Sequence, residues 1–345
     1  MKYKTSELPS IINDTYTLPA LTAGIQNQGL NNYVPRDGAT ILKNVISISA
    51  NGANTGATFF QSQEFTVLQD AYAIEWVNHN VHLTDNQYLF LVSAISKAIY
   101  GNYEWTNKAG WERIKNDFIN LPTDKGNIDF DFMESFVAEL EALRVAELEA
   151  YLKVTGLKDY NLTIEEEKSL ERFDSINWIS FNLEKLFGKS TRGRRLKSDD
   201  RVPGNLPFVT AGEADEGVSD FIGNNVVIFN ENTTTIDMFG SAKYRDYKYG
   251  GDDHIAVVHT EELEKYASVF VTSAIHKSSH NGQFSYDKNF YAKDADELNI
   301  MLPEKNGKPD YNFMKTLISA IHKIVIKEVV EYADEKISVT KLIIN

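Results

Sequence analysis

The stretch Leu18-Pro19-Ala20-Leu21-Thr22-Ala23-Gly24 decides the fold because it recurs 188 residues further on. The second copy is Leu206-Pro207-Phe208-Val209-Thr210-Ala211-Gly212. At the same offset Gly29 corresponds to Gly217, so the likeness extends beyond the seven residues of the motif. A repeated motif of this kind indicates that the chain contains two related structural units.

The correspondence continues towards the end of each copy. Residues 93–97 match 273–277, and residues 126–133 match 307–314. The matches keep the same order, and the small gaps between them are of the length that loops tolerate. The chain of 345 residues is long enough for two domains that each bury a core.

Each copy begins with short segments rich in Val, Ile, Thr and aromatic residues, and this composition predicts strands. We expect strands within 18–22, 40–49 and 65–76 of the first copy, and within 207–210, 225–229, 233–238 and 255–259 of the second.

Each copy ends with apolar residues at helical spacing, from Phe132 to Lys153 and again from Leu317 to Tyr332. Such a seam favours a partner helix, and the two equivalent helices are suitable partners for each other. The alternative is that each helix packs on its own sheet domain. After the first helix, Thr163 and Glu166 have the spacing of a capping box, which predicts the start of another helix.

The net charge of −14 is unevenly distributed. Residues 129–174 hold thirteen acidic and five basic side chains, a net −8, whereas residues 184–201 carry a net +4. A local basic segment of this kind can meet phosphate even on an acidic protein.

The sequence excludes several classes of protein. It has no cysteine, so disulfides, thiolate metal sites and cysteine nucleophiles are ruled out. It has no phosphate loop, dinucleotide fingerprint or hydrolase motif, and we expect no catalytic residues. We also expect no membrane span or secretory signal, and therefore a cytoplasmic protein.

We expect no metal site either. His79 and His82 form a close pair, but without a carboxylate at the spacing of a helical metal site. A nuclease-like pattern made of Pro309-Asp310, Asp334 and Lys336 is discounted because its last two residues belong to a predicted helix.

The repeated segments resemble the target recognition domains of type I restriction-modification specificity subunits. The similarity lies in LPFVTAG (206–212), GVSDFI (217–222) and TTIDMFG (234–240), with the variants LPALTAG (18–24) and SISANG (47–52) in the first copy. The length of the chain looks most like the short specificity subunit of type IIB (BcgI-like) systems.

The resemblance implies an α+β protein with two tandem β-rich recognition domains, each followed by a long helix, the two helices pairing as an antiparallel coiled coil. We expect recognition domains at 1–131 and 175–312, a helix and spacer at 132–174, and a distal helix and tail at 313–345.

Such a subunit would bind double-stranded DNA at a bipartite target, with one half-site per domain, and would dock methyltransferase and endonuclease subunits on its helices. We expect S-adenosylmethionine and Mg²⁺ in those partners and no cofactor on this chain. Two other classes stay open, an acidic DNA-mimicking anti-restriction protein and a tandem β binding module.

The candidate DNA-binding residues are basic, amide-bearing or aromatic side chains in loops. In the second domain they are Lys189, Arg192, Arg194, Arg195, Lys197, Lys243, Tyr244, Arg245, Lys248, Lys277, His280, Asn281, Gln283 and Tyr286. In the first domain they are Lys2, Lys4, Asn51, Asn54, Thr58, Lys97, Asn102, Tyr103 and Trp105. The candidate subunit-docking residues on the helices are Phe136, Leu140, Leu143, Ile318, Ile321 and Val325.

Overall fold

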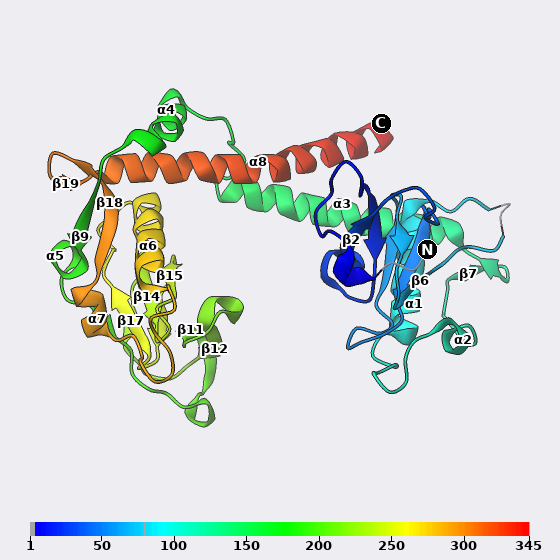
Figure 1. The fold of residues 1–345 in the computed structure, drawn as a ribbon, viewed down its shortest axis with the longest axis horizontal. Coiled ribbons are helices and arrows are strands. Elements are labelled where there is room, and N and C mark those ends of the chain that lie inside the picture. The colour runs from blue at the N-terminus through cyan, green and yellow to red at the C-terminus, as the bar shows by residue number, and fades with distance from the viewer. Residues whose placement is uncertain (1–3, 79–80, 345) are drawn as a thin grey trace. The chain divides into compact units, whose positions relative to one another are not determined.

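The computed structural model describes residues 4–78 and 81–344, with side chains described as far as residue 338 (Figure 1). It divides into two compact units. The first unit comprises residues 1–149 and 335–345, and the second comprises residues 150–334. Each unit contains one copy of the repeat found in the sequence.

In the described part of the first unit, the strands form a sheet of order β2-β1-β5, a sheet of order β4-β3-β6 and the hairpin β7-β8. The strands are β1 (Leu18–Leu21), β2 (Leu30–Val34), β3 (Val45–Ser49), β4 (Thr58–Gln61), β5 (Thr66–Val67), β6 (Ala71–Ile74), β7 (Thr123–Asp124) and β8 (Asn127–Ile128).

Helix α1 (Asp85–Ile99) completes the core of the first unit, and the short helix α2 (Trp111–Ile114) follows it. A capping box at Thr84 starts α1, because the Thr84 hydroxyl accepts the Gln87 N–H and the Gln87 side chain accepts the Thr84 N–H. Leu91 of α1 packs with Ile48 of β3 in one buried cluster.

In the second unit the sheets have the orders β12-β11-β16-β13, β10-β17-β14-β15 and β19-β18-β9. The strands are β9 (Trp178–Asn182), β10 (Thr191–Arg192), β11 (Pro203–Val209), β12 (Val218–Ile222), β13 (Ile228–Phe229), β14 (Thr233–Asp237), β15 (Ala242–Arg245), β16 (Tyr249–Gly251), β17 (Ile255–Val258), β18 (Asn299–Lys305) and β19 (Lys308–Pro309). Apart from the two long helices described below, its α-helices are α4 (Ile164–Arg172), α5 (Leu183–Phe187), α6 (Lys265–Ser279) and α7 (Ala292–Glu297).

Helix α6 runs along the sheet that contains β14, β15 and β17 (Figure 1). Its buried residues Val271 and Ile275 pack with Ile236 of β14, Ala256 of β17 and Leu302 of β18. This cluster is the main hydrophobic core of the second unit.

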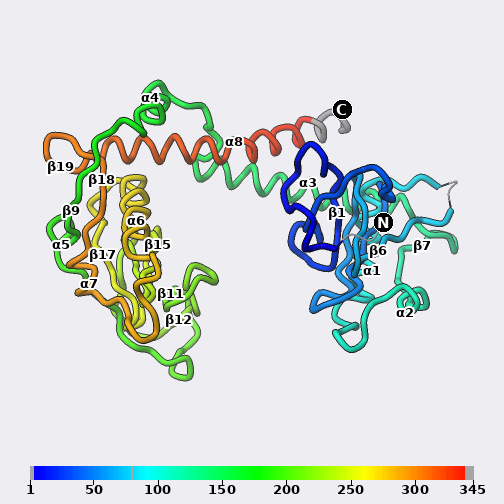
Figure 2. The backbone as a smooth tube through the Cα atoms, viewed as in Figure 1, coloured from blue at the N-terminus to red at the C-terminus, as the bar shows by residue number. Residues whose placement is uncertain are grey.

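The structure confirms the repeat down to the backbone angles. In the first unit β1 and β2 are joined through η2 (Gln26–Gly29), and in the second β11 and β12 are joined through η5 (Ala214–Gly217). Asn27 and Gln28 have φ of 46° and 54°, and the equivalent Asp215 and Glu216 have the same two values. Figure 2 shows the path of the chain through the β11–β12 pair.

The two long helices predicted from the sequence are present as α3 (Phe130–Val154) and α8 (Tyr311–Ile344). Within the first unit, Lys336 of α8 lies 2.6 Å from the carboxylate of Glu141 on α3. Lys336 therefore belongs to a helix, as predicted, and is engaged in an ion pair.

The predicted capping box of α4 is also confirmed. The Thr163 hydroxyl accepts the Glu166 N–H at 3.2 Å, and the Glu166 carboxylate accepts the Thr163 N–H at 2.7 Å. The same carboxylate accepts hydrogen bonds from Ser319 (2.6 Å) and Lys323 (3.0 Å) of α8. It thereby fastens α4 to α8 within the second unit.

Some predicted strands are shorter than expected. Only 45–49 of the segment 40–49 is a regular strand, and 65–76 is divided into β5 and β6. Asp70 interrupts the extended chain because its φ is 72°, in the left-handed region. Of the helices that the structure describes, none has the length and apolarity needed to cross a membrane.

Candidate nucleic-acid interface

The backbone of the basic segment, residues 189–201, is held against the second unit. Its strand β10 pairs with β17, and the Arg194 N–H donates to the Gly251 carbonyl at 2.9 Å. Gly193 approaches Gly251 so closely that an added Cβ would lie 1.9 Å from this carbonyl oxygen. The backbone is fixed while the predicted cationic side chains of the segment are exposed. These are Lys189, Arg192, Arg194, Arg195 and Lys197.

Asp252 provides a second attachment for this segment, because its carboxylate accepts the Leu196 N–H at 3.3 Å. Burial raises the pKa of Asp252, and the neighbouring Asp253 carboxylate adds to this effect. Asp252, Asp253 and His254 offer possible metal-ligand atoms within 4.8 Å of one another. The hydrogen bond to Leu196 gives Asp252 a structural role that requires no ion.

Arg245 was predicted to contact DNA, and the structure shows that this prediction is wrong. The residue is only 1% exposed. Its guanidinium donates to Thr235 Oγ1 (3.0 Å), Tyr247 Oη (2.8 Å) and the Glu216 carbonyl (2.7 Å). Arg245 therefore stabilises the interior of the domain and the η5 turn, and it cannot reach a ligand outside.

Its neighbours in the sequence have different surroundings. The half-buried Lys243 pairs with Glu213 at 3.2 Å, and a hydrogen bond from Ser241, together with Lys243, lowers the pKa of Glu213. Tyr244 donates to Asn232 Oδ1 at 3.0 Å, and burial raises its pKa to about 12. Lys248 is exposed.

The end of α6 and the loop after it form another exposed group in the second unit. His280 follows the last residue of α6, and its Nδ1 lies 3.2 Å from the Phe239 carbonyl. The Tyr286 ring meets Phe239 edge to face, with 5.1 Å between ring centroids. The exposed candidates here are Lys277, His280, Asn281, Gln283 and Tyr286.

In the first unit the structure also corrects one candidate. Thr58 is buried, and its hydroxyl donates to the Gly56 carbonyl at 3.0 Å, so it cannot contact DNA. Lys4, Lys97, Asn102 and Trp105 are exposed. Lys2 and His79 lie outside the described residues.

Three candidates of the first unit, the exposed Asn102 among them, have partners inside the domain. Asn51 donates to Asp70 at 2.9 Å. Asn102 donates to the Ala98 carbonyl at 2.7 Å, and Tyr103 donates to Asp117 at 2.7 Å. These bonds shape the loops that carry the exposed side chains.

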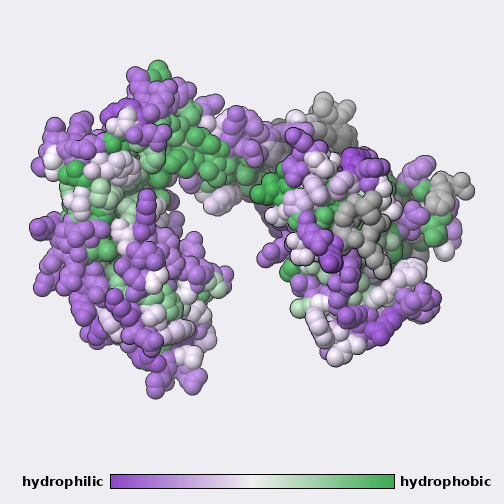
Figure 3. All heavy atoms as spheres, viewed as in Figure 1, coloured by the Kyte–Doolittle hydropathy of each residue, from purple (hydrophilic) through white to green (hydrophobic). Residues whose placement is uncertain are grey.

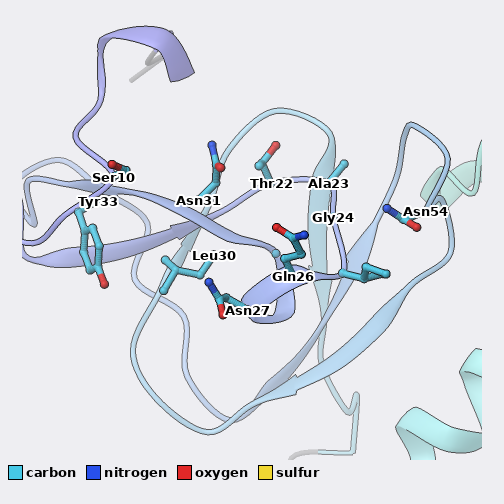
Figure 4. Close-up of a pocket in the computed structure, with 12 residues that line it drawn as sticks. Ser10, Thr22, Ala23, Gly24, Gln26, Asn27, Leu30, Asn31, Tyr33 and Asn54 are labelled. Carbon is cyan, nitrogen blue, oxygen red and sulfur yellow. The ribbon is translucent and has the colours of Figure 1, made fainter. Parts of the chain in front are cut away.

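A polar cavity of about 670 Å³ lies beside the turn between β1 and β2 (Figure 4). Asn54 is the predicted residue among those that line it. Gln26, Asn27 and Asn31 also line it and are not among the residues predicted from the sequence. The match of Gly29 with Gly217 marks this turn in both copies and is the signal that could have identified them.

The candidate docking residues lie on α3 and α8. Phe136, Leu140 and Leu143 are about half exposed, and Phe136 stacks on Phe132 with 5.9 Å between ring centroids. Of the docking candidates on α8, Ile321 and Val325 are exposed.

Ile318 differs from the other docking candidates, because it is half-buried against the core of the second unit. With Ile321 it lines an apolar cavity of about 870 Å³, together with Phe173, Trp178 and Phe270. Figure 3 shows the hydrophobic surface that gathers along this part of α8.

Comparison with known proteins places the chain in a family. The model of the type I restriction modification DNA specificity domain matches residues 2–150 and again residues 175–332. A curated relative, the Type II restriction enzyme BgcI specificity subunit S.BcgI of Heyndrickxia coagulans, is 24% identical over 257 residues. The match covers 72% of this chain and 70% of that protein.

A solved structure has a similar fold. The type I restriction-modification system S subunit of M. genitalium matches with a TM-score of 0.58 and 14% identity, over 97% of this chain and 90% of that one. At this identity the match concerns the fold alone. Since the domain model covers most of the sequence in two copies, the chain belongs to the type I restriction-modification DNA specificity domain family.

Proposed function

We propose that this chain is the non-catalytic subunit that selects the DNA target of a restriction-modification complex, with one half-site for each domain. The proposal rests on a family domain that is present twice. The turn in each copy has the same backbone angles but carries different side chains. The turn η2 presents Gln26, Asn27 and Gln28, whereas η5 presents Asp215 and Glu216 on the same backbone angles. Two similar but non-identical domains suit an asymmetric, bipartite target.

The exposed side chains support direct contact with a duplex. Arg194, Arg195 and Lys197 can neutralise phosphates or donate to guanine, while amides such as Asn281 and Gln283 can form paired hydrogen bonds with adenine. Phosphate contacts position the protein on the duplex, and base contacts select the sequence. The basic side chains can make contacts of the first kind, and the basic and amide side chains can make contacts of the second.

The long helices are proposed as the docking surface for methyltransferase and endonuclease subunits, and as an antiparallel coiled coil. The ion pair between Lys336 and Glu141 supports a pairing of α8 with α3. Leu140 and Ile321 occupy equivalent positions in the repeat, and both are exposed apolar residues on these helices. We expect S-adenosylmethionine and Mg²⁺ to bind in those partner subunits.

Co-expression of this chain with the product of the adjacent gene, which the proposal expects to be a methyltransferase, tests the proposal. Single-molecule sequencing of host DNA should show methylation at a bipartite sequence, and the purified chain alone should neither methylate nor cut DNA. The double variant Arg194→Ala and Arg195→Ala should reduce methylation at that sequence. A change of the exposed Lys168 of α4 to alanine serves as the control and should not. Methylation without sequence preference, or a complex without methylation, would contradict the proposal.

A further inference from the structure

The loops that follow α1 and α6 end in the same small hairpin. In the first unit Glu104 and Asn107 exchange two backbone hydrogen bonds, both of 3.0 Å. In the second unit Ser285 and Lys288 exchange two, of 3.0 and 3.1 Å. Reciprocal bonds of this kind close a two-residue hairpin loop.

The two hairpins occupy equivalent places in the repeat, at an offset of 181 residues. This is also the offset of the later match between residues 126–133 and 307–314. The glycines that precede the hairpins, Gly101 and Gly282, have φ of 83° and 84°. The backbone therefore turns in the same way before each hairpin.

Each hairpin places an aromatic residue first in its loop. Trp105 in the first unit is 68% exposed, and Tyr286 in the second is 82% exposed. Lys108 lies 5.5 Å from the centre of the Trp105 ring, and Phe239 supports the Tyr286 ring from one side. The rings therefore have a support on one side and are largely open to solvent.

Both hairpins are anchored in buried structure directly after the tip. Ala109 is fully buried, its N–H donates to Thr55 Oγ1 at 2.9 Å, and its carbonyl accepts the Tyr72 hydroxyl at 2.9 Å. The equivalent Phe290 is 1% exposed and donates its N–H to the Met238 carbonyl at 2.9 Å. A ring held on a short loop between such anchors loses little conformational freedom when it binds.

The side chains beside the tips suit a nucleobase as the ligand. Asn102 and Gln283 occupy equivalent positions three residues before the tip, and both are exposed amides. Each donates one N–H to a backbone carbonyl, of Ala98 (2.7 Å) and Ser278 (3.3 Å), so the amide oxygen and the second N–H are the groups offered to a base. Aromatic rings stack on bases without regard to sequence, while amides distinguish base edges. Aromatic or apolar side chains that enter a base step also unstack it and bend the duplex.

We propose that Trp105 and Tyr286 are paired stacking residues, each inserted at one base step of the half-site bound by its own domain. The proposal rests on the function proposed above. It assigns the tips a shared task, deformation of the duplex, and leaves the choice of bases to the neighbouring polar side chains.

The test uses the full chain in complex with its methyltransferase and a duplex that contains the methylated sequence. Single 2-aminopurine substitutions along each half-site, placed away from the base that the methyltransferase flips out of the duplex, report unstacking as a rise in fluorescence. With the wild-type chain we expect one such rise in each half-site. Trp105→Ala should abolish the rise in one half-site alone, and Tyr286→Ala should abolish it in the other. Each variant should weaken binding by about 10- to 100-fold.

Four further variants separate stacking from folding. Trp105→Phe and Tyr286→Phe keep an aromatic ring and should keep most of the signal. Phe118→Ala and Phe221→Ala remove exposed aromatic residues away from the tips and should change neither half-site.

Several results would overturn the proposal: fluorescence unchanged by the tip variants, equal loss in both half-sites, or loss of the methyltransferase with the DNA signal intact. The last would assign the tips to a protein contact. If the tip variants give one of these results while sequence-specific methylation is normal, only the tip proposal is refuted. If the wild-type complex lacks sequence-specific methylation, both proposals are refuted.

Discussion

Replacing Glu166 with alanine should loosen the attachment of α4 to α8 in the second unit. Glu166 is 5% exposed, and its carboxylate accepts hydrogen bonds from the Thr163 N–H, the Ser319 hydroxyl and the Lys323 ammonium group. Alanine would leave these three donors without their acceptor. Two of them lie more than 150 residues away in the chain, so the change acts on tertiary structure as well as on the helix cap.

The expected loss follows from the strength of such bonds. Hydrogen bonds to a charged group contribute about 1.5–3 kcal/mol each, and breaking a buried ion pair costs about 3–5 kcal/mol. Lys323 keeps bonds to the Asn161 carbonyl at 2.8 Å and to Asp159 at 3.5 Å, which reduces the loss. We therefore expect local stability to fall by about 2–4 kcal/mol.

Hydrogen exchange followed by mass spectrometry on the full chain measures this change. Peptides from α4 and from residues 311–334 should exchange about thirtyfold faster or more, since each 1.4 kcal/mol corresponds to a factor of ten. Asp159→Ala is the matched control, because this exposed carboxylate contacts the same lysine but contributes under about 1 kcal/mol. Equal effects of the two variants would refute the reasoning.

The same contact should depend on pH. Burial alone would raise the pKa of Glu166, but the bonds from Ser319, Thr163 and Lys323 outweigh it and lower the pKa. A lowered folded-state pKa means that the stabilisation is complete above the unfolded-state value, about 4.3. The difference between wild type and Glu166→Ala should therefore be full at neutral pH. It should decrease as the pH falls through 4.3 towards the lowered value.

Three other substitutions give distinct outcomes. Gly193→Ala should displace the basic segment and weaken DNA binding, because the added Cβ would clash with the Gly251 carbonyl. Gly110→Ala is the control for the same assay. It should leave binding unchanged, because no atom lies within 4 Å of its added Cβ. Arg245→Met should lower the free energy of unfolding by about 2–4 kcal/mol in thermal or denaturant unfolding, because the buried Thr235 hydroxyl, the half-buried Tyr247 hydroxyl and the Glu216 carbonyl lose their donor. Unchanged stability of Arg245→Met would contradict the structural role of Arg245. Lys248→Ala should leave stability unchanged. If Lys248 binds a phosphate, the substitution should also reduce the slope of log DNA affinity against log salt concentration by about 0.9.

The internal repeat and the long helices could be predicted because their signals are local. The glycine-bearing motif recurs with the same backbone angles, and apolar spacing marks α3 and α8. Helices α1 and α6 were not assigned from the sequence, although residues 93–97 and 273–277 within them were matched to each other. Both helices have partly buried apolar residues around much of their circumference, so a single apolar stripe does not stand out.

The candidate residues show where local reasoning reaches its limit. Arg245 and Lys248 are basic residues three positions apart, and nothing in their immediate sequence separates them. The structure buries the first, because the β14–β15 pairing and the η5 turn surround it with acceptors, and exposes the second. The choice of exposed basic, amide and aromatic residues as DNA contacts stays a prediction.

By itself, the sequence determined the doubled architecture, the family resemblance, the capping box of α4 and the concentration of positive charge in residues 189–201. Only the tertiary structure decided which of the selected side chains are buried and that Trp105 and Tyr286 stand at equivalent hairpin tips. The physical reason is distance along the chain. Repeats, caps and helical spacing depend on neighbours in sequence, whereas exposure depends on strands and helices brought together from remote segments, as the bond between Glu166 and Ser319 illustrates.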